Sequence, residues 1–226
     1  MIHSNMGQTT ALTSATVMWP NEHKELCGMI AYFISTLQWR HNGLGLLQAY
    51  IREGERSELR VHIWHPELQR PGIIDSGLYH DHRFDLTSKI LVGSIKQREF
   101  RLTPAVLGSH VLHEVVHARA AAGSKHAPND GLVTTLPGRY HVEQTDMWLG
   151  AGSAYTFPKR EFHGSLSSEL TVTLMLKTNQ DSIPARILAP YDTPVVHAFA
   201  DPLPHSKWKH ITEGAKEALM RMWETR

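Results

Sequence analysis

His80 and His82 lie on either side of Asp81 in the stretch GLYHDH, residues 77–82. In an extended strand alternate side chains face the same way, so these two imidazoles share one face and can reach a single ion. Two histidines are only half of a catalytic metal site, because such a site usually takes about three protein ligands and leaves positions open for water or substrate. The stretch therefore predicts a metal site whose third ligand comes from elsewhere in the chain.

The best candidate for that third ligand is His163, in the stretch AGSAYTFPKREFHG of residues 151–164. Gly152 and Pro158 precede this histidine and indicate a turn that leads between two strands. Because His163 is far from His80 and His82 in the sequence, only the fold can bring the three side chains together.

The elements expected to position these histidines are mostly strands. From about residue 44 to 177, short runs rich in aliphatic, aromatic and β-branched residues alternate with glycine and proline and are not separated by helices, which predicts a sandwich or barrel. The strand-like runs include LYHDH, TSKILVGSIKQREFRL, HVLHEVVHA, RYHVEQTDMWL and LTVTLMLK. Apolar residues at helical spacing predict a helix over residues 23–38 and a closing helix over 211–224. Beyond residue 177, a proline-rich segment is expected to wrap the surface irregularly.

Composition restricts the class of protein. The chain has 226 residues, which suits one domain spanning 1–226, and its formal net charge is +1, with 23 Lys and Arg against 22 Asp and Glu. This balance gives no electrostatic footprint for nucleic acid or a membrane surface, and a small-molecule partner is expected instead. A single cysteine and the absence of a long apolar run at the start favour a cytoplasmic protein. No segment reaches the roughly 20 apolar residues of a membrane span.

The first histidine stretch resembles the first motif of the cupin superfamily. That motif runs His-x-His, three or four residues, glutamate, six residues, glycine. His80, His82 and Gly93 match it, while Leu86 stands in the place of the glutamate.

The second stretch resembles the second cupin motif, and the two occur in the expected order. That motif runs glycine, five residues, proline, one residue, glycine, two residues, histidine, three residues, asparagine. Gly152, Pro158 and His163 fall on this spacing, whereas Arg160 replaces the second glycine and Ser167 the asparagine.

The resemblance implies an all-β, cupin-type β-barrel of two antiparallel sheets with flanking N- and C-terminal helices. It also implies one divalent ion bound by His80, His82 and His163. Without the glutamate the ligand set is similar to that of the three-histidine thiol dioxygenases among the cupins, which implies an Fe(II)-dependent oxygenase that uses O2 on a small polar molecule. Zn, Ni, Mn or Cu would suit three imidazoles as well. A cupin isomerase or lyase, or a non-catalytic ligand-binding cupin, are alternatives, and a homodimer is possible within the family.

Five further residues are candidates for the site. Asp85, three residues after His82, is a candidate carboxylate ligand, although alternation from Leu86 would turn it outward unless a bulge intervenes. Tyr155 is a candidate for orienting substrate or oxygen through its hydroxyl, or else a core residue. In ELRVHIWHP, the alternate residues Arg60, His62 and Trp64 share one strand face. If that face lines the barrel interior, they are candidates for binding substrate; the alternative is that the face points to solvent.

A competing motif is HExxH, formed by His113, Glu114 and His117. On a helix the two histidines would share one face and bind zinc, with the glutamate as the general base of a protease. The same residues also fit a strand, in which Glu114 faces away from the two histidines. Gly123 occupies the place of the third histidine of the extended zinc-protease pattern, so the strand is the favoured interpretation.

Overall fold

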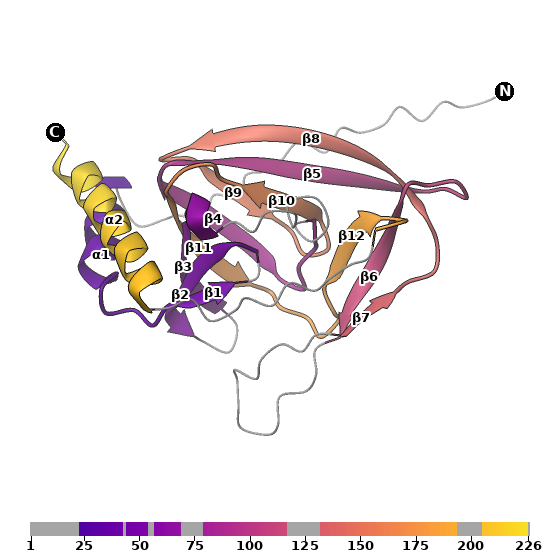
Figure 1. The fold of residues 1–226 in the computed structure, drawn as a ribbon, viewed down its shortest axis with the longest axis horizontal. Coiled ribbons are helices and arrows are strands. Elements are labelled where there is room, and N and C mark those ends of the chain that lie inside the picture. Colours follow the sequence, from indigo (N-terminus) through magenta and orange to yellow (C-terminus); the bar gives the residue numbers. More distant parts are fainter. Residues whose placement is uncertain are drawn as a thin grey trace, which may run out of the picture.

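A computed structural model describes residues 23–42, 44–53, 57–68, 79–116, 132–193 and 205–225 of the chain. Two antiparallel sheets form its centre and a helix lies at each end of the sequence (Figure 1). The predicted all-β architecture of two antiparallel sheets with flanking helices is therefore confirmed.

The first sheet has the order β1-β2-β3-β11-β4-β9. Its strands are Arg40–Asn42 (β1), Leu46–Glu53 (β2), Ser57–Trp64 (β3), Asp85–Val92 (β4), Ala154–Phe157 (β9) and Thr171–Thr178 (β11). Strand β11, near the end of the barrel region, thus lies between β3 and β4, and this brings the two ends of that region together.

The second sheet has the order β10-β5-β8-β6-β12, and β7 pairs with β6. Its strands are Ser94–Pro104 (β5), His110–Val116 (β6), Leu132–Thr135 (β7), Tyr140–Gly150 (β8), Phe162–Leu166 (β10) and Arg186–Pro190 (β12). The long strands β5 and β8 run side by side along the top of the view in Figure 1.

The helices α1 (His23–Phe33) and α2 (His205–Glu224) pack together and cover one face of the first sheet. Period-two alternation in β3 explains this cover: Val61 and Ile63 are fully buried beneath the helices, while their neighbours point to the opposite face. A short 3-10 helix, η1 (Pro66–Leu68), follows β3 and buries Leu68 in the same cluster. The first sheet is thus apolar toward the helices and keeps its other face for the barrel interior.

The interior face of the first sheet meets the second sheet. Leu46, Trp64 and Ile90 of the first sheet form one buried cluster with Ile95 of β5. A second cluster lies nearer the histidines and consists of Phe84, Leu86, Phe157 and Met175. The second sheet therefore closes over the face that carries the candidate substrate-binding residues.

Gly93 separates β4 from β5 within a run that the sequence pattern does not divide. Its φ is +77°, in the left-handed region, and a Cβ there would lie 2.3 Å from Thr171 Oγ1 and 2.5 Å from Leu170 O. Only glycine fits such a close approach of backbone to backbone. The turn lets β4 belong to the first sheet and β5 to the second.

Several element bounds differ from the expectations. Helix α1 ends at Phe33 rather than at residue 38, and α2 begins at His205 rather than at 211. The described part of the segment LYHDH, residues 79–82, forms two isolated β-bridges, both at His80, rather than a strand. Strand β12 lies in the segment expected to be irregular. This strand ends at Pro190, where the missing N–H falls at the end of its pairing with β6, and the prolines around it hid the strand in the sequence. Within the described residues, no helix combines the length and the apolar character needed to span a membrane.

Candidate metal centre

The fold brings together His80, His82 and His163. One ring nitrogen from each lies within 4.8 Å of the others. The ring centroids are 4.7 Å apart for His80 and His82, 5.1 Å for His80 and His163, and 5.0 Å for His82 and His163. Two imidazole nitrogens bound to one ion at about 2.1 Å are about 3 to 4 Å apart, so small ring rotations suffice to close on a metal.

Backbone pairing holds His80 between two strands. Its bridge to His163 of β10 is antiparallel, and a second antiparallel bridge joins it to Ile187 of β12. The N–H of His80 donates to the carbonyl of His163 at 3.0 Å, and the N–H of His163 donates back to the carbonyl of His80 at 3.0 Å. Directly opposed residues of an antiparallel pair face the same side, so this bridge puts both imidazoles on one face.

Asp81 anchors the segment from the opposite side, a role that the sequence pattern did not reveal. Its side chain is fully buried, and its Oδ1 accepts the backbone N–H of Arg186 at 2.6 Å. Its Oδ2 accepts Nε and Nη2 of the same arginine, both at 2.7 Å. Alternation turns Asp81 toward β12 while His80 and His82 face the cluster, so the aspartate between the two histidines serves to anchor their segment.

Two aromatic rings wall the cluster. Phe157 of β9 stacks on His163 with centroids 4.1 Å apart and an interplanar angle of 8°, and Phe84 stacks on His82 at 4.5 Å and 29°. Both phenylalanines are buried. The rings orient the imidazoles and keep water from two sides of the cluster.

Burial holds His82 and His163 in the neutral state that a metal requires. Burial, and after it the neighbouring His80, lower the pKa of His163 to about 3, although the carbonyl of Glu161 acts in the opposite direction. Burial likewise lowers the pKa of His82 well below its usual value, with contributions from His80, His163 and Arg60. These imidazoles offer free lone pairs at neutral pH.

In the turn before His163, Arg160 stands at the position of the second glycine in the sequence pattern. Arg160 has φ +74°, a left-handed conformation that glycine adopts easily. Its backbone N–H donates to the carbonyl of His82 at 2.9 Å. Its guanidinium donates to Pro184 O at 2.7 Å, to Ile183 O at 2.8 Å and to Asp181 Oδ1 at 2.5 Å. The side chain thus compensates for the backbone conformation and ties the turn to the segment before β12.

Several solved structures are similar to this chain at low sequence identity. A cupin-2 domain protein from Shewanella frigidimarina is 12% identical, with a TM-score of 0.31, over 58% of this chain and 79% of that one. KdgF from Halomonas sp. is 13% identical, with a TM-score of 0.35, over 65% and 93%. The DMSP lyase DddQ from Ruegeria pomeroyi is 13% identical, with a TM-score of 0.35, over 67% and 60%.

The likeness to these structures is distant, so the chemistry rests on this chain's own residues. Neither a protein-family model nor a curated protein sequence matches the chain. The structure places the residues of the two sequence motifs as follows: the histidine pair precedes β4, Gly93 makes the turn to β5, and His163 lies on β10.

Asp85 does not join the histidines in the barrel. Its Oδ1 accepts the backbone N–H of Lys159 at 2.8 Å, and its Oδ2 accepts Nδ2 of Asn179 at 2.9 Å. Leu86, the next residue, is buried in the interior. The expectation of a fourth, carboxylate ligand at Asp85 is therefore corrected: normal alternation holds and no bulge reverses it. Among the described residues, no acidic side chain joins the three histidines.

Tyr155 lies on β9 opposite Ser88 of β4. Burial raises the pKa of its hydroxyl, and the neighbouring side chains of Ser88, Gln97 and Ser165 act against that rise. Gln97 is itself fully buried and accepts the Ser165 hydroxyl at 2.7 Å. The tyrosine thus belongs to a polar layer inside the barrel rather than to the histidine cluster.

Arg60, His62 and Trp64 share the interior face of β3, because Val61 and Ile63 face the helices. Burial, and after it the positive charge of Arg60, lower the pKa of His62 to about 3. His62 Nε2 and Trp64 Nε1 are shielded from solvent and have no hydrogen-bond partner among the described residues. Arg60 and His62 lie close enough to His82 to lower its pKa, so this face adjoins the histidine cluster.

Glu58 and Lys177 complete this face, although sequence reasoning did not single them out. Glu58 accepts Lys177 Nζ at 2.8 Å and Arg60 Nε at 3.0 Å, and it is ion-paired with the Arg60 guanidinium. Lys177 Nζ lies 4.7 Å from the centroid of the Phe84 ring that stacks on His82. The signal for Glu58 was present in its period-two spacing from Arg60, whereas Lys177 required the register of β11 against β3.

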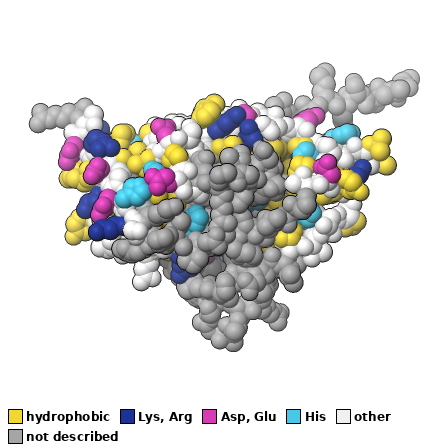
Figure 2. Space-filling view, in the orientation of Figure 1, with side chains coloured by type: hydrophobic (Ala, Val, Ile, Leu, Met, Phe, Trp, Pro, Cys, Tyr) yellow, Lys and Arg dark blue, Asp and Glu magenta, His cyan; other side chains and the backbone are white. Residues whose placement is uncertain are grey.

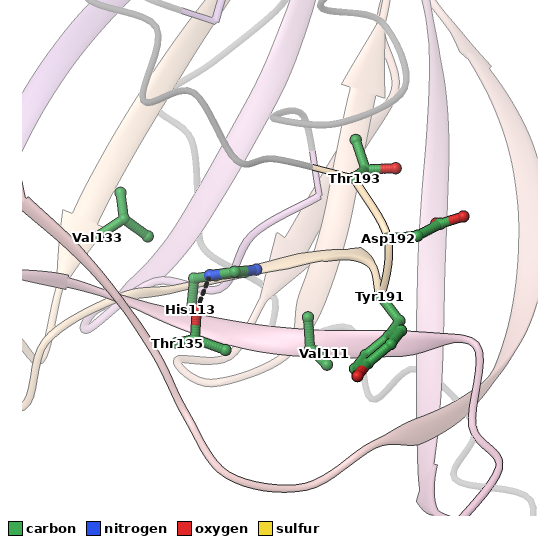
Figure 3. A pocket seen from close by; sticks show the side chains of 7 residues that line it. All are labelled: Val111, His113, Val133, Thr135, Tyr191, Asp192 and Thr193. Carbon is green, nitrogen blue, oxygen red and sulfur yellow. Dashed lines mark hydrogen bonds between the residues drawn. The ribbon is translucent and has the colours of Figure 1, made fainter.

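The HExxH motif does not form a zinc-protease helix. His113 and Glu114 lie on strand β6, where they face opposite sides, and His117 lies outside the described residues. His113 donates to or accepts from the Thr135 hydroxyl at 3.1 Å and lines a cavity of about 360 Å³ with Tyr191 and Asp192 (Figure 3). None of the three clustered histidines lines this cavity. The favoured strand interpretation is confirmed for the described part of the motif.

Proposed function

We propose that this protein is a mononuclear metal enzyme, an Fe(II)-dependent oxygenase that acts on a small, negatively charged polar molecule. The observation that carries the proposal is the convergence of three imidazoles, from His80, His82 and His163, with no acidic side chain beside them in the described residues.

The donor set fits a divalent transition ion. Three imidazoles add no negative charge, and they approach from His80 and His82 on one segment and His163 on the neighbouring strand, which leaves the remaining positions of the ion free. When bound, Fe(II) would supply adjacent positions for substrate and O2 together with the capacity to transfer electrons. Zn, Ni, Mn or Cu suits the same donors, so metal content is the first quantity to measure.

The charged face of β3 supports an anionic substrate. Arg60 and Lys177 carry two positive charges against one on Glu58, and their side chains are only 13%, 7% and 21% exposed, respectively. A buried group with one excess positive charge is stabilised by a single carboxylate or similar anion. The Arg60 guanidinium can bind the two oxygens of a carboxylate through paired donors. Because Arg60 adjoins His82, an anion bound there would present its reactive end to the histidine cluster.

The rest of the interior would orient the substrate and exclude water. The unpartnered Nε2 of His62 and Nε1 of Trp64 are available to a polar substrate group, as are the buried Ser88 hydroxyl and Thr173 hydroxyl. Phe84 and Phe157 close the cluster with apolar surface. Tyr155 would hold its proton at neutral pH, because burial raises the pKa of its hydroxyl, and would act as a hydrogen-bond donor.

The test combines metal analysis with oxygen uptake. Protein purified without added metal is analysed for its elements, and the Fe(II)-loaded protein is then assayed for oxygen consumption against a panel of small carboxylic acids. We expect about one ion per chain and substrate-dependent oxygen uptake, both lost in His82→Ala. Full stoichiometric metal in His82→Ala, with the wild-type spectrum, would reject the metal site.

Other outcomes assign the remaining alternatives. Product formation without oxygen consumption would replace the oxygenase by a metal-dependent isomerase or lyase. Stabilisation by a carboxylic acid without product would indicate a ligand-binding protein. The matched control is His141→Ala: His141 is an exposed histidine on β8, so neither metal content nor turnover should change.

A further inference from the structure

A second group of metal-ligating side chains lies outside the barrel, where the end of β3 meets α2. His65, Glu67 and His210 each offer one ligand atom, and these atoms lie within 4.8 Å of one another. His210 Nε2 is 3.3 Å from Glu67 Oε1, and the rings of His65 and His210 meet edge to face with centroids 5.9 Å apart. Figure 2 shows histidine and acidic side chains next to one another on the part of the surface that belongs to α2.

Both sides of this group are attached to the packed core. Leu68, next to Glu67, is 2% exposed, and Ile211, next to His210, is also 2% exposed. The two belong to the same hydrophobic cluster beneath the helices. The backbone that carries the three ligands is therefore held in place before any ion binds, and preorganisation of this kind reduces the entropic cost of binding.

The chemistry of the donors selects the kind of ion. Two imidazole nitrogens and one carboxylate oxygen suit a borderline divalent transition ion, whereas Ca²⁺ and Mg²⁺ require mostly oxygen ligands. The carboxylate would also neutralise half of the ion's charge. His65 Nδ1 accepts the backbone N–H of Glu67 at 3.3 Å, a long hydrogen bond. Whichever ring nitrogen of His65 binds the ion, the cost is at most this one weak bond.

We propose that His65, Glu67 and His210 form a second, surface metal site that binds a divalent transition ion such as Zn²⁺ and links α2 to the end of β3. The site is structural, because it joins two elements and does not open into the barrel. The side chains of Glu67 and His210 are 49% and 55% exposed, so the ion exchanges readily and binds more weakly than at the barrel histidines. By linkage, the bound ion stabilises the packing of α2 on the barrel.

The test uses Zn²⁺ as the probe in equilibrium dialysis and thermal unfolding of the full chain. The wild type is expected to bind two ions per chain, His82→Ala one ion, His210→Ala one ion, and the double variant none with comparable affinity. Micromolar Zn²⁺ should raise the midpoint of thermal unfolding in His82→Ala, and this rise should disappear in the double variant. Because His210→Ala leaves the barrel histidines intact, these variants distinguish Zn²⁺ binding at the surface site from Zn²⁺ binding in the barrel.

Two further variants complete the design. Glu67→Gln, on an exposed side chain, should weaken the second ion at least roughly tenfold without unfolding the chain. His141→Ala, which removes an exposed histidine from the other sheet, should leave Zn²⁺ binding unchanged. If His82→Ala and His82→Ala/His210→Ala bind Zn²⁺ equally, or if Glu67→Gln binds as tightly as the wild type, the second site does not exist.

Discussion

His80 and His163 exchange both of their backbone hydrogen bonds, each at 3.0 Å from nitrogen to oxygen. The spacing of their rings, 5.1 Å between centroids, is therefore set by the sheet and not by an ion. A cluster built in this way should persist when the metal is removed. The metal-free protein is expected to remain folded, and variants near the cluster can be compared without metal as well as with it.

Asp81→Asn should weaken both the fold and the metal site. The buried carboxylate accepts three donors from Arg186, and an amide of the same shape removes its charge and replaces one acceptor by a donor. Breaking a buried pair in this way costs about 3 kcal/mol in the free energy of unfolding, somewhat less here because Arg186 is 29% exposed. Urea unfolding of the metal-free protein measures the first effect. Metal titration should show weaker binding, because Asp81 positions the two histidines beside it.

Asp146→Asn is the control for this variant. Asp146 pairs with Lys96 and Arg98 on the exposed strands β5 and β8. Exposed ion pairs contribute little to stability. If Asp81→Asn is no more destabilising than Asp146→Asn, the buried pair does not hold the histidine segment.

The stability of the metal-free protein should fall as the pH is lowered from about 7 to about 5. Burial holds the pKa of His62 and of His163 at about 3, below the value of about 6.5 expected in the unfolded chain. A pKa depressed in the folded state contributes stability that is fully present above pH 6.5 and is lost as the pH falls toward the folded value. Between those limits, each histidine contributes a slope of up to about 1.4 kcal/mol per pH unit.

Urea unfolding at several pH values between 7.5 and 5 measures this slope. His62→Gln should reduce it by close to one proton, while exposed His141→Ala should leave it unchanged. A free energy of unfolding that is constant over this range would show that the interior histidines titrate normally.

Sequence reasoning identified the histidines and the faces of β3 because both depend on local spacing. The alternation that puts Val61 and Ile63 beneath the helices leaves Arg60, His62 and Trp64 inside, as the structure shows. A single alternation rule also explains why Asp85, next to the buried Leu86, faces away from the cluster.

The partners of these residues were not accessible from spacing. Lys177 meets Glu58 because β11 pairs with β3 in one register, and Asp81 meets Arg186 because β12 runs beside the histidine segment. Strand order and register depend on the packing of the whole barrel, so no local pattern specifies them. The prolines after residue 177 also concealed β12, the strand that supplies this arginine.

Arg160→Ala should destabilise the protein more than Arg160→Gly. Both variants lose the guanidinium bonds to Pro184, Ile183 and Asp181, but alanine keeps the unfavourable φ of +74° that glycine tolerates. The difference between the two variants should be about 1 kcal/mol, the cost of a left-handed non-glycine residue. Both keep the backbone N–H that donates to His82, so their metal affinities should be similar. Equal stability of the two variants would mean that the conformation carries no strain.

Gly93→Ala and Gly152→Ala should separate steric from conformational cost. Both glycines have positive φ, +77° and +88°, so alanine pays a similar backbone penalty of about 1 kcal/mol at either position. At Gly152 a new Cβ meets nothing within 4 Å, whereas at Gly93 it would lie 2.5 Å from the carbonyl of Leu170. Gly93→Ala must therefore push β4 and β11 apart and should cost about 2 kcal/mol more than Gly152→Ala in urea unfolding. Since β4 follows the histidine pair and β11 carries Lys177, Gly93→Ala should also weaken metal binding. Equal losses of stability in the two variants would show that the turn at Gly93 adapts to a side chain.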